Sequence, residues 1–466
     1  MGSSLELEEP AIHLIGDLYI HSTIPESLSI LCDEIGPRPC GSDGEVKARD
    51  FLIQSLEKYG LDNVRLEEFD YLGWERVSAK LLVEVPSLSL SRRIPCLSAG
   101  LTPSGQAEGR LFYVGYGRPE EFDGQKDKIE GRIAFAHCDL SRVSSQTGLP
   151  SNYPEQMNLA ARYGASAFIS IARRAPGLIG TGPGMFNGAR EALEIPAVFV
   201  SREDGEWMLR LMRKGFDVKV SLEVENRLEW RRSWNVVGEL VGKESPEEQV
   251  IVSSHYDSWD LGPGAIDDAS GTVVLLDIAR ALTRHRDRFR RTVKFVAFSV
   301  EEIGCGGSYA YMRLHEKEFD NIAFMMDLEL PGQPSGYWVS DEALAKALEG
   351  MASKLGYSLS LSARTGGIYS DSSVFALEGV QRAGLALRAT EPPASLFGHT
   401  QADTPDKLSV EALKDCAVAI GYLLFHALSL PEIPIRRLPE EEVRRFYEAS
   451  GLASLLKILR AWPYSG

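Results

Sequence analysis

The sequence predicts an α/β fold in which helices cover both faces of a central mixed, mostly parallel sheet. From Ser233 onward, strand-like and helix-like segments alternate, which is typical of sheets built from strand–helix–strand units. Strands such as VKFVAFSV (293–300) and IAFMMDL (322–328) are apolar at nearly every position, which indicates burial on both faces. Between residues 96 and 231 the pattern changes to short strands with frequent turn signals, which predicts a small β-rich domain inserted into the larger one.

The first region combines helices and strands. Residues 25–60 predict a helix, a Gly/Pro loop (GPRPCGSDG) and a second helix that stops at Gly60. Two strands are expected next, near 64–69 and 79–85. We therefore predict a discontinuous larger domain formed by residues 1–95 and 232–466.

The inserted segment 96–231 contains few side chains that suit a metal. Its strands include GRIAFAHCD, ASAFISIA and IPAVFVS, and residues 175–189 form a Gly/Pro-rich loop. His137 and Cys138 are its only soft candidate ligands, and we expect both to be structural.

The second part of the larger domain has a regular order of elements. Strands are predicted at 234–240, 249–254, 292–299, 322–328, 337–340 and 384–389, and helices at 269–283, 307–315, 342–355, 371–378 and 410–427. A helical tail follows within 433–466, and it could either serve dimer formation or pack on the sheet.

Composition restricts the class of protein. The chain has 466 residues, 44% hydrophobic and 25% charged, as in an ordinary globular protein, and a net charge of -16 argues against nucleic acid or anionic lipid as partners. Six scattered cysteines indicate free thiols. The first residues lack the pattern of a signal peptide, and no apolar run reaches the ~18 residues of a membrane span. We expect a cytoplasmic protein, or a secreted one if a leader has been removed.

Polar residues gather where the predicted strands end. In open α/β sheets, ligands bind beyond the carboxyl ends of the strands. The segment IVSSHYDSWDLGPGAIDDASG (251–271) carries a histidine and several aspartates directly after a strand, and other strands end in similar residues. The resulting candidates are His255, Asp257, Asp267, Glu301, Glu302, Asp327 and His399. Imidazole and carboxylate groups are good zinc ligands, so this edge predicts a metal site.

Charge balance predicts two metal ions. Asp267, Glu302 and Asp327 supply three negative charges, and a bridging hydroxide supplies a fourth against two divalent cations. With His255 and His399 as neutral ligands the cluster is neutral, which avoids the cost of burying unpaired charge. Two metals ~3.5–4 Å apart commonly activate water toward a carbonyl or phosphoryl group.

An ordered set of motifs resembles the co-catalytic zinc metallopeptidases of the M28 family, which include aminopeptidases and carboxypeptidase Q. The motifs are GPRPCGSDG (36–44), HYDSWDLGPGAIDDASG (255–271), VEEIGCGGSYAY (300–311), MMDLEL (325–330), YSDSSVF (369–375) and GHTQADTPDKL (398–408). The run HYDSWDLGPGAIDD is especially similar to the carboxypeptidase Q branch. The segment 96–231 is similar to a protease-associated (PA) domain, expected to restrict access to the pocket.

The resemblance implies the three-layer zinc-peptidase fold and a role for each site residue. One metal would take His255, Asp267 and Asp327, and the other Asp267, Glu302 and His399, with Asp267 bridging. Glu301 would be the general base and Asp257 would orient His255. The Asp267–Asp268 bond is expected to be cis. Asp371 falls where relatives carry an aspartate near the pocket.

The sequence departs from the family pattern at two places. Several relatives have a tyrosine directly before the last histidine, where this chain has Gly398, so the oxyanion-stabilising group is open, with Tyr369 a candidate. Glu329 could replace Asp327 as the ligand, because residues two apart on a strand face the same side.

These expectations lead to a di-zinc exopeptidase that removes N-terminal residues from short peptides, with Co²⁺ or Mn²⁺ able to substitute. One alternative is a dipeptidase or carboxypeptidase that reads the substrate's carboxyl end through Arg364, Arg382 or Arg388. A non-catalytic protein like the transferrin receptor ectodomain should lack ligands, and here every position is filled. The inserted domain argues against a glutaminyl cyclase.

Overall fold

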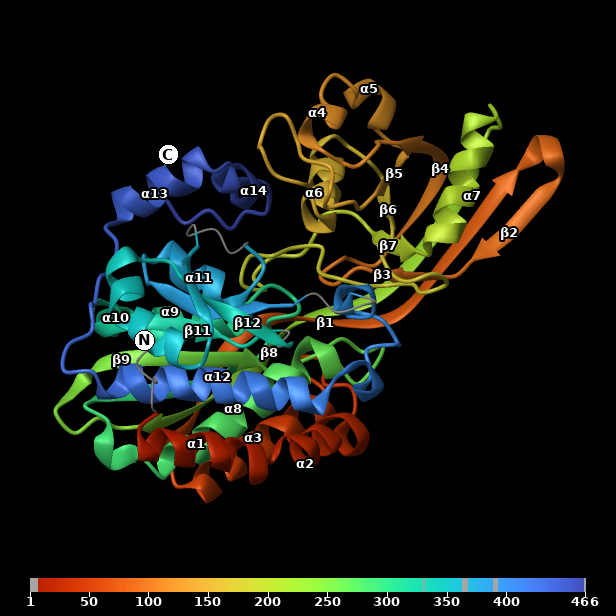
Figure 1. Ribbon diagram of the computed structural model, residues 1–466. Helices are drawn as coiled ribbons and strands as arrows, with labels where there is room; N and C mark the ends of the chain where they lie inside the picture. Colours follow the sequence, from red (N-terminus) through yellow and green to blue (C-terminus); the bar gives the residue numbers. More distant parts are fainter. Residues whose placement is uncertain (1–6, 330–331, 363–367, 389–392, 465–466) are drawn as a thin grey trace.

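The computed structural model describes residues 7–329, 332–362, 368–388 and 393–464, and its centre is the predicted mixed sheet (Figure 1). In spatial order the strands are β13 (Ser358–Leu361), β12 (Pro334–Val339), β14 (Arg382–Leu387), β11 (Ile322–Asp327), β9 (Ser245–His255), β10 (Arg291–Phe298), β8 (Lys219–Leu240) and β1 (Asp62–Val85). Parallel pairing joins β10 to β9, β9 to β11, β11 to β14 and β12 to β13, whereas β12 pairs antiparallel with β14, and β8 pairs antiparallel with both β10 and β1. The predicted fold class is confirmed.

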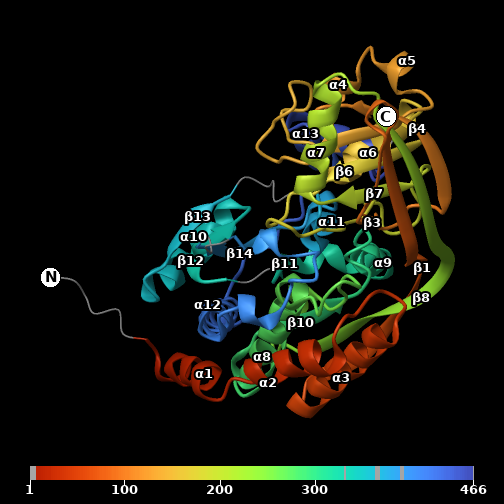
Figure 2. The same cartoon turned by 90° about the vertical axis from the view of Figure 1, so that its right-hand side faces the viewer.

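Helices cover both faces of this sheet, because its strands are apolar on both sides. Val252 and Phe295 belong to one apolar core, whereas their neighbours Ile251 and Val296 belong to another. The first face is covered by α1 (Glu9–Ile20), α2 (Ile24–Ser29), α3 (Asp43–Tyr59), α8 (Ser270–Thr283) and α12 (Val410–Ser429). The opposite face carries α9 (Gly306–Leu314) and α11 (Asp371–Leu377) (Figure 2).

Among the described residues, α12 alone is long and apolar enough to cross a membrane by length and composition. It is 72% buried over its most apolar window, where it packs against α1 and α8. Its apolar character is therefore explained by its place in the core of the larger domain.

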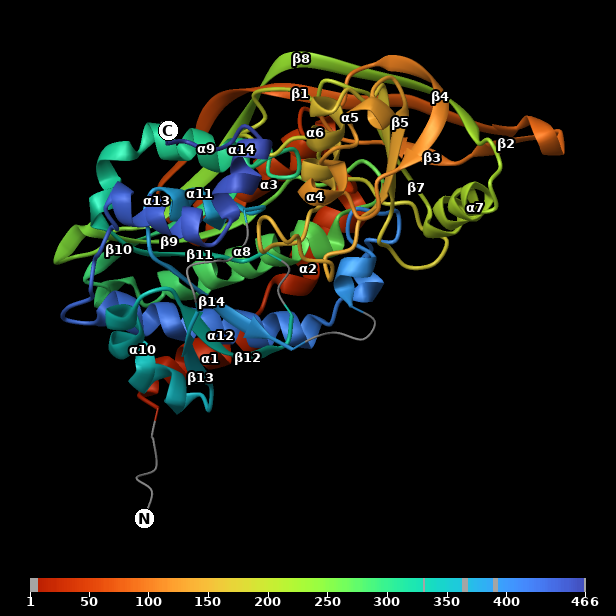
Figure 3. The same cartoon turned by 90° about the horizontal axis from the view of Figure 1, so that it is seen from above.

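The strands β1 and β8 form one long ribbon that runs from the central sheet into the inserted segment (Figure 3). The sequence predicted two short strands, near 64–69 and 79–85, where the structure has the single strand β1, and this prediction was wrong. Pairing continues from Asp62 opposite Glu239 to Glu84 opposite Lys219. Gly73 lies within the ribbon where the side chain of Arg231 crosses; a Cβ there would lie 2.6 Å from its Cδ.

The inserted segment adds five shorter strands and four helices. Its strands are β3 (Cys96–Ser98), β4 (Gly105–Tyr113), β5 (Ile133–His137), β6 (Ala167–Ile171) and β7 (Ala197–Val200), and its helices are α4 (Pro119–Phe122), α5 (Lys126–Ile129), α6 (Tyr153–Arg162) and α7 (Arg202–Arg213). Phe168 and Phe199 share an apolar core with Phe298 of the central sheet. The segment therefore packs on the larger domain rather than standing apart.

The carboxyl-terminal tail is helical, as predicted, with α13 (Glu440–Ala449) and α14 (Leu452–Ile458). The Arg162 guanidinium of α6 donates hydrogen bonds to the carbonyl oxygens of Lys457 and Ile458 at 2.7 and 2.9 Å. Val443 and Leu455 join the core shared with the inserted segment. The tail therefore links the two parts of the same chain.

Candidate metal centre

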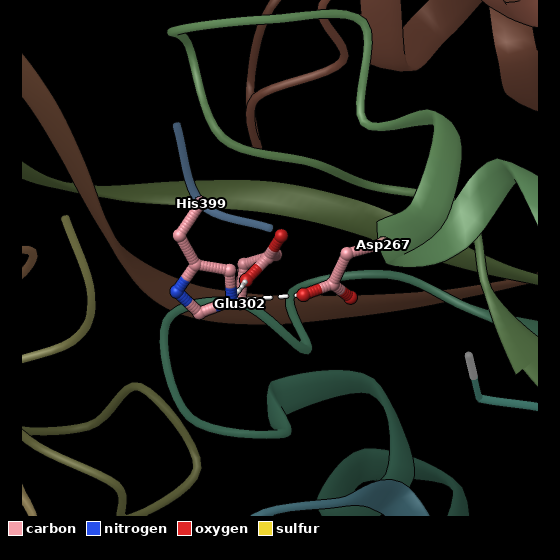
Figure 4. A group of neighbouring side chains, drawn as sticks. All are labelled: Asp267, Glu302 and His399. Carbon is pink, nitrogen blue, oxygen red and sulfur yellow. Dashed lines mark ion pairs between the residues drawn. The ribbon is translucent and has the colours of Figure 1, made fainter. Parts of the chain in front are cut away.

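The predicted site residues meet at the carboxyl edge of the central sheet, as the strand order requires. His255 is the last residue of β9, Asp327 is the last of β11, and Glu301 and Glu302 follow β10. Asp267 lies in the short turn 265–269 before α8, where the Asp267–Asp268 bond is cis, as predicted. His399 comes from the loop that precedes α12. One ligand atom from each of Asp267, Glu302 and His399 lies within 4.8 Å of the others (Figure 4).

Asp267 lies between the two histidines. Its Oδ1 is 3.1 Å from Nε2 of His255, and its Oδ2 is 2.9 Å from Nε2 of His399. The same nitrogen of His399 is 3.1 Å from Oε2 of Glu302. Burial alone would raise the pKa of Asp267, but the two facing imidazoles lower it. This is the geometry that a bridging carboxylate needs.

The imidazole rings are oriented so that each Nε2 can bind a cation. Nδ1 of His255 lies 3.2 Å from the carbonyl oxygen of Asp257, and Nδ1 of His399 lies 3.2 Å from that of Thr181. A carbonyl oxygen only accepts, so each Nδ1 carries a proton and, in the neutral ring, each Nε2 has a free lone pair. A lone pair facing a carboxylate at this distance requires a proton or a metal ion between them. The donor set therefore fits a divalent metal.

The surrounding carboxyl groups are buried and close to one another. Burial raises the pKa of Glu302 to about 7 even though His399 faces it. Burial also raises the pKa of Glu301 and Glu329 well above the usual range, and neighbouring carboxylates add to this effect in both. Oε1 of Glu302 is buried and has no hydrogen-bond partner within the described part of the chain. The cluster is thus built to receive positive charge.

Asp257 holds the backbone of the two glutamates. Its Oδ1 accepts from the N–H of Glu301 and its Oδ2 from the N–H of Glu302, both at 3.2 Å. The thiol of Cys40 also donates to Oδ2, at 3.1 Å. Oδ1 lies 3.5 Å from Nδ1 of His255. Asp257 therefore helps to position both His255 and the backbone of the two glutamates.

Glu301 lies beside the first histidine. Its Oε2 is 4.0 Å from Nε2 of His255, and its Oε1 accepts from the thiol of Cys305 at 3.4 Å. The side chain is buried, and the carboxyl group of Asp371, at the start of α11, adds to the rise in its pKa. A carboxyl group kept from water in this way suits proton transfer.

The structure favours Glu329 over Asp327 as the side chain available to a metal. Both carboxylate oxygens of Asp327 accept hydrogen bonds, from Oγ of Ser253 at 2.6 Å and from the N–H of Ser372 at 3.1 Å. Glu329 lies beyond the end of β11 and lines a cavity together with Asp267 and His399. The two-residue spacing could not distinguish Asp327 from Glu329, because it assumes that both residues lie on the strand, whereas β11 ends at Asp327.

This cavity, of about 330 Å³, separates the cluster from the inserted segment. Tyr153, Arg173 and Arg174 of the insert line its far wall. These three residues could not be predicted from the sequence, because they become neighbours of the cluster only when the insert packs on the sheet.

Other candidates for substrate contact lie elsewhere. The hydroxyl of Tyr369 donates to the buried carboxylate of Glu155, so Tyr369 is not free to stabilise an oxyanion in the cavity. Neither Arg382 nor Arg388 lines the cavity, and Arg364 lies outside the described residues.

This sheet, with its histidine–carboxylate cluster at the carboxyl edge, is the zinc-peptidase type of α/β fold. Residues 235–424 match the model of peptidase family M28.

Two relatives with known names illustrate the match. Carboxypeptidase Q of Bos taurus is 27% identical over 307 residues, which cover 66% of this chain but only 64% of that protein. Aminopeptidase YwaD of Bacillus subtilis is 27% identical over 426 residues, or 88% of this chain and 85% of that protein.

Solved structures show the same fold over most of the chain. A peptidase M28 precursor from Shewanella amazonensis superposes with a TM-score of 0.78 at 24% identity, covering 92% of this chain and 98% of that one. BSAP, a zinc aminopeptidase from Bacillus subtilis, gives a TM-score of 0.66 at 24% identity, covering 92% and 100%. The similarity of the inserted segment to a PA domain stays a prediction.

Proposed function

We propose that the chain is a di-zinc exopeptidase that removes the N-terminal residue from short peptides. The observation that carries this proposal is the placement of two imidazole Nε2 atoms on opposite oxygens of Asp267. The match to family M28 and the similarity to proteins named as aminopeptidases support it.

We assign the ligands from the contacts of each side chain. His255, Asp267 and Glu329 would hold one ion, with Glu329 in place of Asp327, and Asp267, Glu302 and His399 would hold the other. The three carboxylates would offset three of the four positive charges that two divalent cations bring to the site. When bound, the ions polarise the scissile carbonyl and lower the pKa of the attacking water.

Glu301 is the group that moves the proton in this proposal. Its carboxylate lies beside His255 and would accept the proton of the attacking water, then pass it to the amine that leaves. Asp257 keeps Glu301 and Glu302 in position through their N–H groups. The cavity is small, which favours short peptides over folded proteins.

Tyr153 replaces the tyrosine that this chain lacks at Gly398. Its side chain lines the cavity beside His399, where its phenol would donate to the developing oxyanion. Edge-to-face packing against Phe199, with ring centroids 5.3 Å apart, fixes the ring. The inserted segment would therefore contribute to catalysis.

Metal analysis and substrate assays test the proposal together. The protein, stripped with a chelator and reloaded with Zn²⁺, should bind two ions per chain and hydrolyse leucine p-nitroanilide and Leu-Gly-Gly. The N-acetylated forms should not be cleaved. A reloaded protein that binds two ions but cleaves none of these compounds would refute the aminopeptidase function.

A second candidate is a dipeptidase that reads the carboxyl end of its substrate. It is favoured by Arg173 and Arg174, which line the cavity together with Asp267 and Glu329. A guanidinium group pairs well with a carboxylate. Comparing Leu-Gly with its C-terminal amide separates the two functions: a dipeptidase should lose activity on the amide, whereas an aminopeptidase should not.

A further inference from the structure

The inserted segment contacts His399 through both main-chain groups of Thr181. The N–H of Thr181 donates to the carbonyl oxygen of His399 at 3.1 Å, and the carbonyl oxygen of Thr181 accepts from Nδ1 of the same histidine at 3.2 Å. One residue of the insert therefore fixes both the backbone and the ring of His399. A hydrogen-bonded partner behind a metal-binding imidazole sets the direction of the ring and its affinity for the ion.

The backbone of His399 depends on such support. Its φ of 57° lies in the left-handed region, which residues other than glycine adopt less often. His399 also lies in a loop, whereas His255 is the last residue of a buried strand and is held by the sheet. We therefore expect the position of His399 to be more sensitive to its neighbours than that of His255.

Thr181 is held in turn by Arg76 of the β1/β8 ribbon. Nη2 of Arg76 donates to Oγ1 of Thr181 at 3.0 Å, and this hydroxyl donates to the carbonyl oxygen of Ser98 at 3.2 Å. Nη1 of Arg76 donates to the same carbonyl oxygen. The guanidinium group thus fixes Thr181 both directly and through Ser98.

Arg76 is itself fixed by its surroundings, and only 9% of its side chain is exposed. Its Nε and Nη2 contact the two carboxylate oxygens of Asp260 at 2.9 and 3.1 Å, and its guanidinium lies 5.1 Å from the ring centroid of Trp74. Trp74 packs edge to face on Trp259 with centroids 6.0 Å apart, and the ring of Trp259 lies 5.7 Å from that of His399. A polar route and an aromatic route therefore connect Arg76 to His399.

We infer that Arg76 is a positioning residue for the metal centre, and that it acts through Thr181 to make the inserted segment part of one metal site. The inference rests on the proposed function, because it takes Asp267, Glu302 and His399 as the ligands of one ion. By electrostatics alone, removing the positive charge of Arg76 would strengthen the binding of a cation. A role in positioning predicts the opposite, so the direction of the change separates the two effects.

Arg76→Met tests the inference, with Arg227→Met as a matched control. Arg227 lies on the same ribbon and pairs with Glu75, but 66% of its side chain is exposed. Competition with a chelating dye gives the dissociation constants of Zn²⁺ from the metal-stripped proteins after reloading. We expect Arg76→Met to weaken the binding of one ion about tenfold or more, and that of the other about threefold or less. Arg227→Met should bind both ions like the wild type.

Thr181→Val provides a second variant that leaves the charge unchanged. It removes only the hydroxyl that links Arg76 to the carbonyl oxygen of Ser98. We expect the same ion to bind about threefold or more weakly. Circular dichroism of the metal-free proteins checks the fold, and if Arg76→Met does not fold, Thr181→Val decides the question. Affinities equal to the wild type in both variants, or tighter zinc binding in Arg76→Met, would overturn the inference.

Hydrogen exchange tests the same coupling from the side of the insert and needs no turnover. Coupling between two sites is reciprocal, so an ion that depends on Thr181 should in turn hold the insert loop in place. Zn²⁺ should slow exchange of the amides in residues 178–184 of the wild type, and should do so less in Arg76→Met. Exchange in this loop that does not respond to zinc would overturn the inference. A wild type with these zinc and exchange effects that cleaves no peptide would retain the inference and refute the proposed function.

Discussion

The two walls of the metal-side cavity differ in how the fold positions them. On one wall, the carboxylate of Asp267 faces the imidazole of His399. Both residues lie in segments that connect the strands and helices of the central sheet domain. On the other wall, Tyr153 and the arginine pair come from the inserted segment, and Arg173 is exposed. In the proposed mechanism the sheet edge would supply the metal ligands and the base, whereas the insert would supply the oxyanion donor and the arginines that face the substrate.

The largest effect is expected at the residue that both proposed metal sites share. Asp267→Asn should remove the bound zinc and reduce turnover to background, because the amide cannot carry the charge that bridges two cations. Elemental analysis after reloading measures it. Asp287→Asn, at an exposed ion pair with Lys243, is the control and should keep two ions. Two ions retained in Asp267→Asn would contradict the bridging role.

A somewhat smaller effect is expected at the proposed base. Glu301→Gln should keep the metal and the fold but lower kcat by about 10²–10⁴, because the amide cannot accept a proton. Glu206→Gln, in the insert beside His137, provides the same change away from the site and should leave kcat unchanged. If Glu301→Gln turned over near the wild-type rate, another group would be the base.

A substitution in the insert wall of the cavity should have a smaller effect, and mainly on kcat. Tyr153→Phe should lower kcat about tenfold to a hundredfold with little change in KM, because the phenol acts on the oxyanion and not on the bound peptide. Tyr163→Phe removes a hydroxyl that binds Asp123 on the surface of the same segment and serves as control. Equal values of kcat and KM for Tyr153→Phe and Tyr163→Phe would show that the phenol of Tyr153 takes no part in catalysis.

The smallest effect is a pH dependence of stability in the metal-free protein. The folded pKa of Glu302 is raised to about 7 from 4.5, so its protonated form stabilises the fold, and this stability is lost as pH rises from about 4.5 to about 7. The raised pKa values of His255 and His399 act in the same direction above pH 6.5, and the lowered pKa of Asp267 opposes it only below pH 3.8.

Thermal unfolding followed by circular dichroism measures this change. The metal-free midpoint should fall by several degrees across that range, and added Zn²⁺ should remove the trend. Glu302→Gln should reduce the slope, whereas Glu206→Gln should not. A midpoint that rises with pH in the metal-free protein would contradict the assigned shifts.

The sheet edge could be predicted from sequence because strand ends are local features. An apolar strand followed directly by His255 or by Glu301 fixes the edge at which the side chain leaves the sheet. The insert wall could not be predicted, because Tyr153 and Arg174 reach the cavity only through the shared core. The choice between Asp327 and Glu329 as the metal ligand could not be made from the sequence, because the exact end of β11 decides which of the two carboxyl groups faces the cavity.

The long ribbon has a consequence for dividing the chain. The segment 96–231 cannot be excised as an independent cassette, because residue 231 lies in the middle of β8. Cutting there would leave β1 without its partner from Tyr71, opposite Arg231, to Glu84, opposite Lys219. It would also separate Trp74 from the strand that holds it. The sheet edge that carries the cluster and the segment that faces it are thus joined by the paired strands of one ribbon, and a deletion designed from the sequence boundaries would damage both.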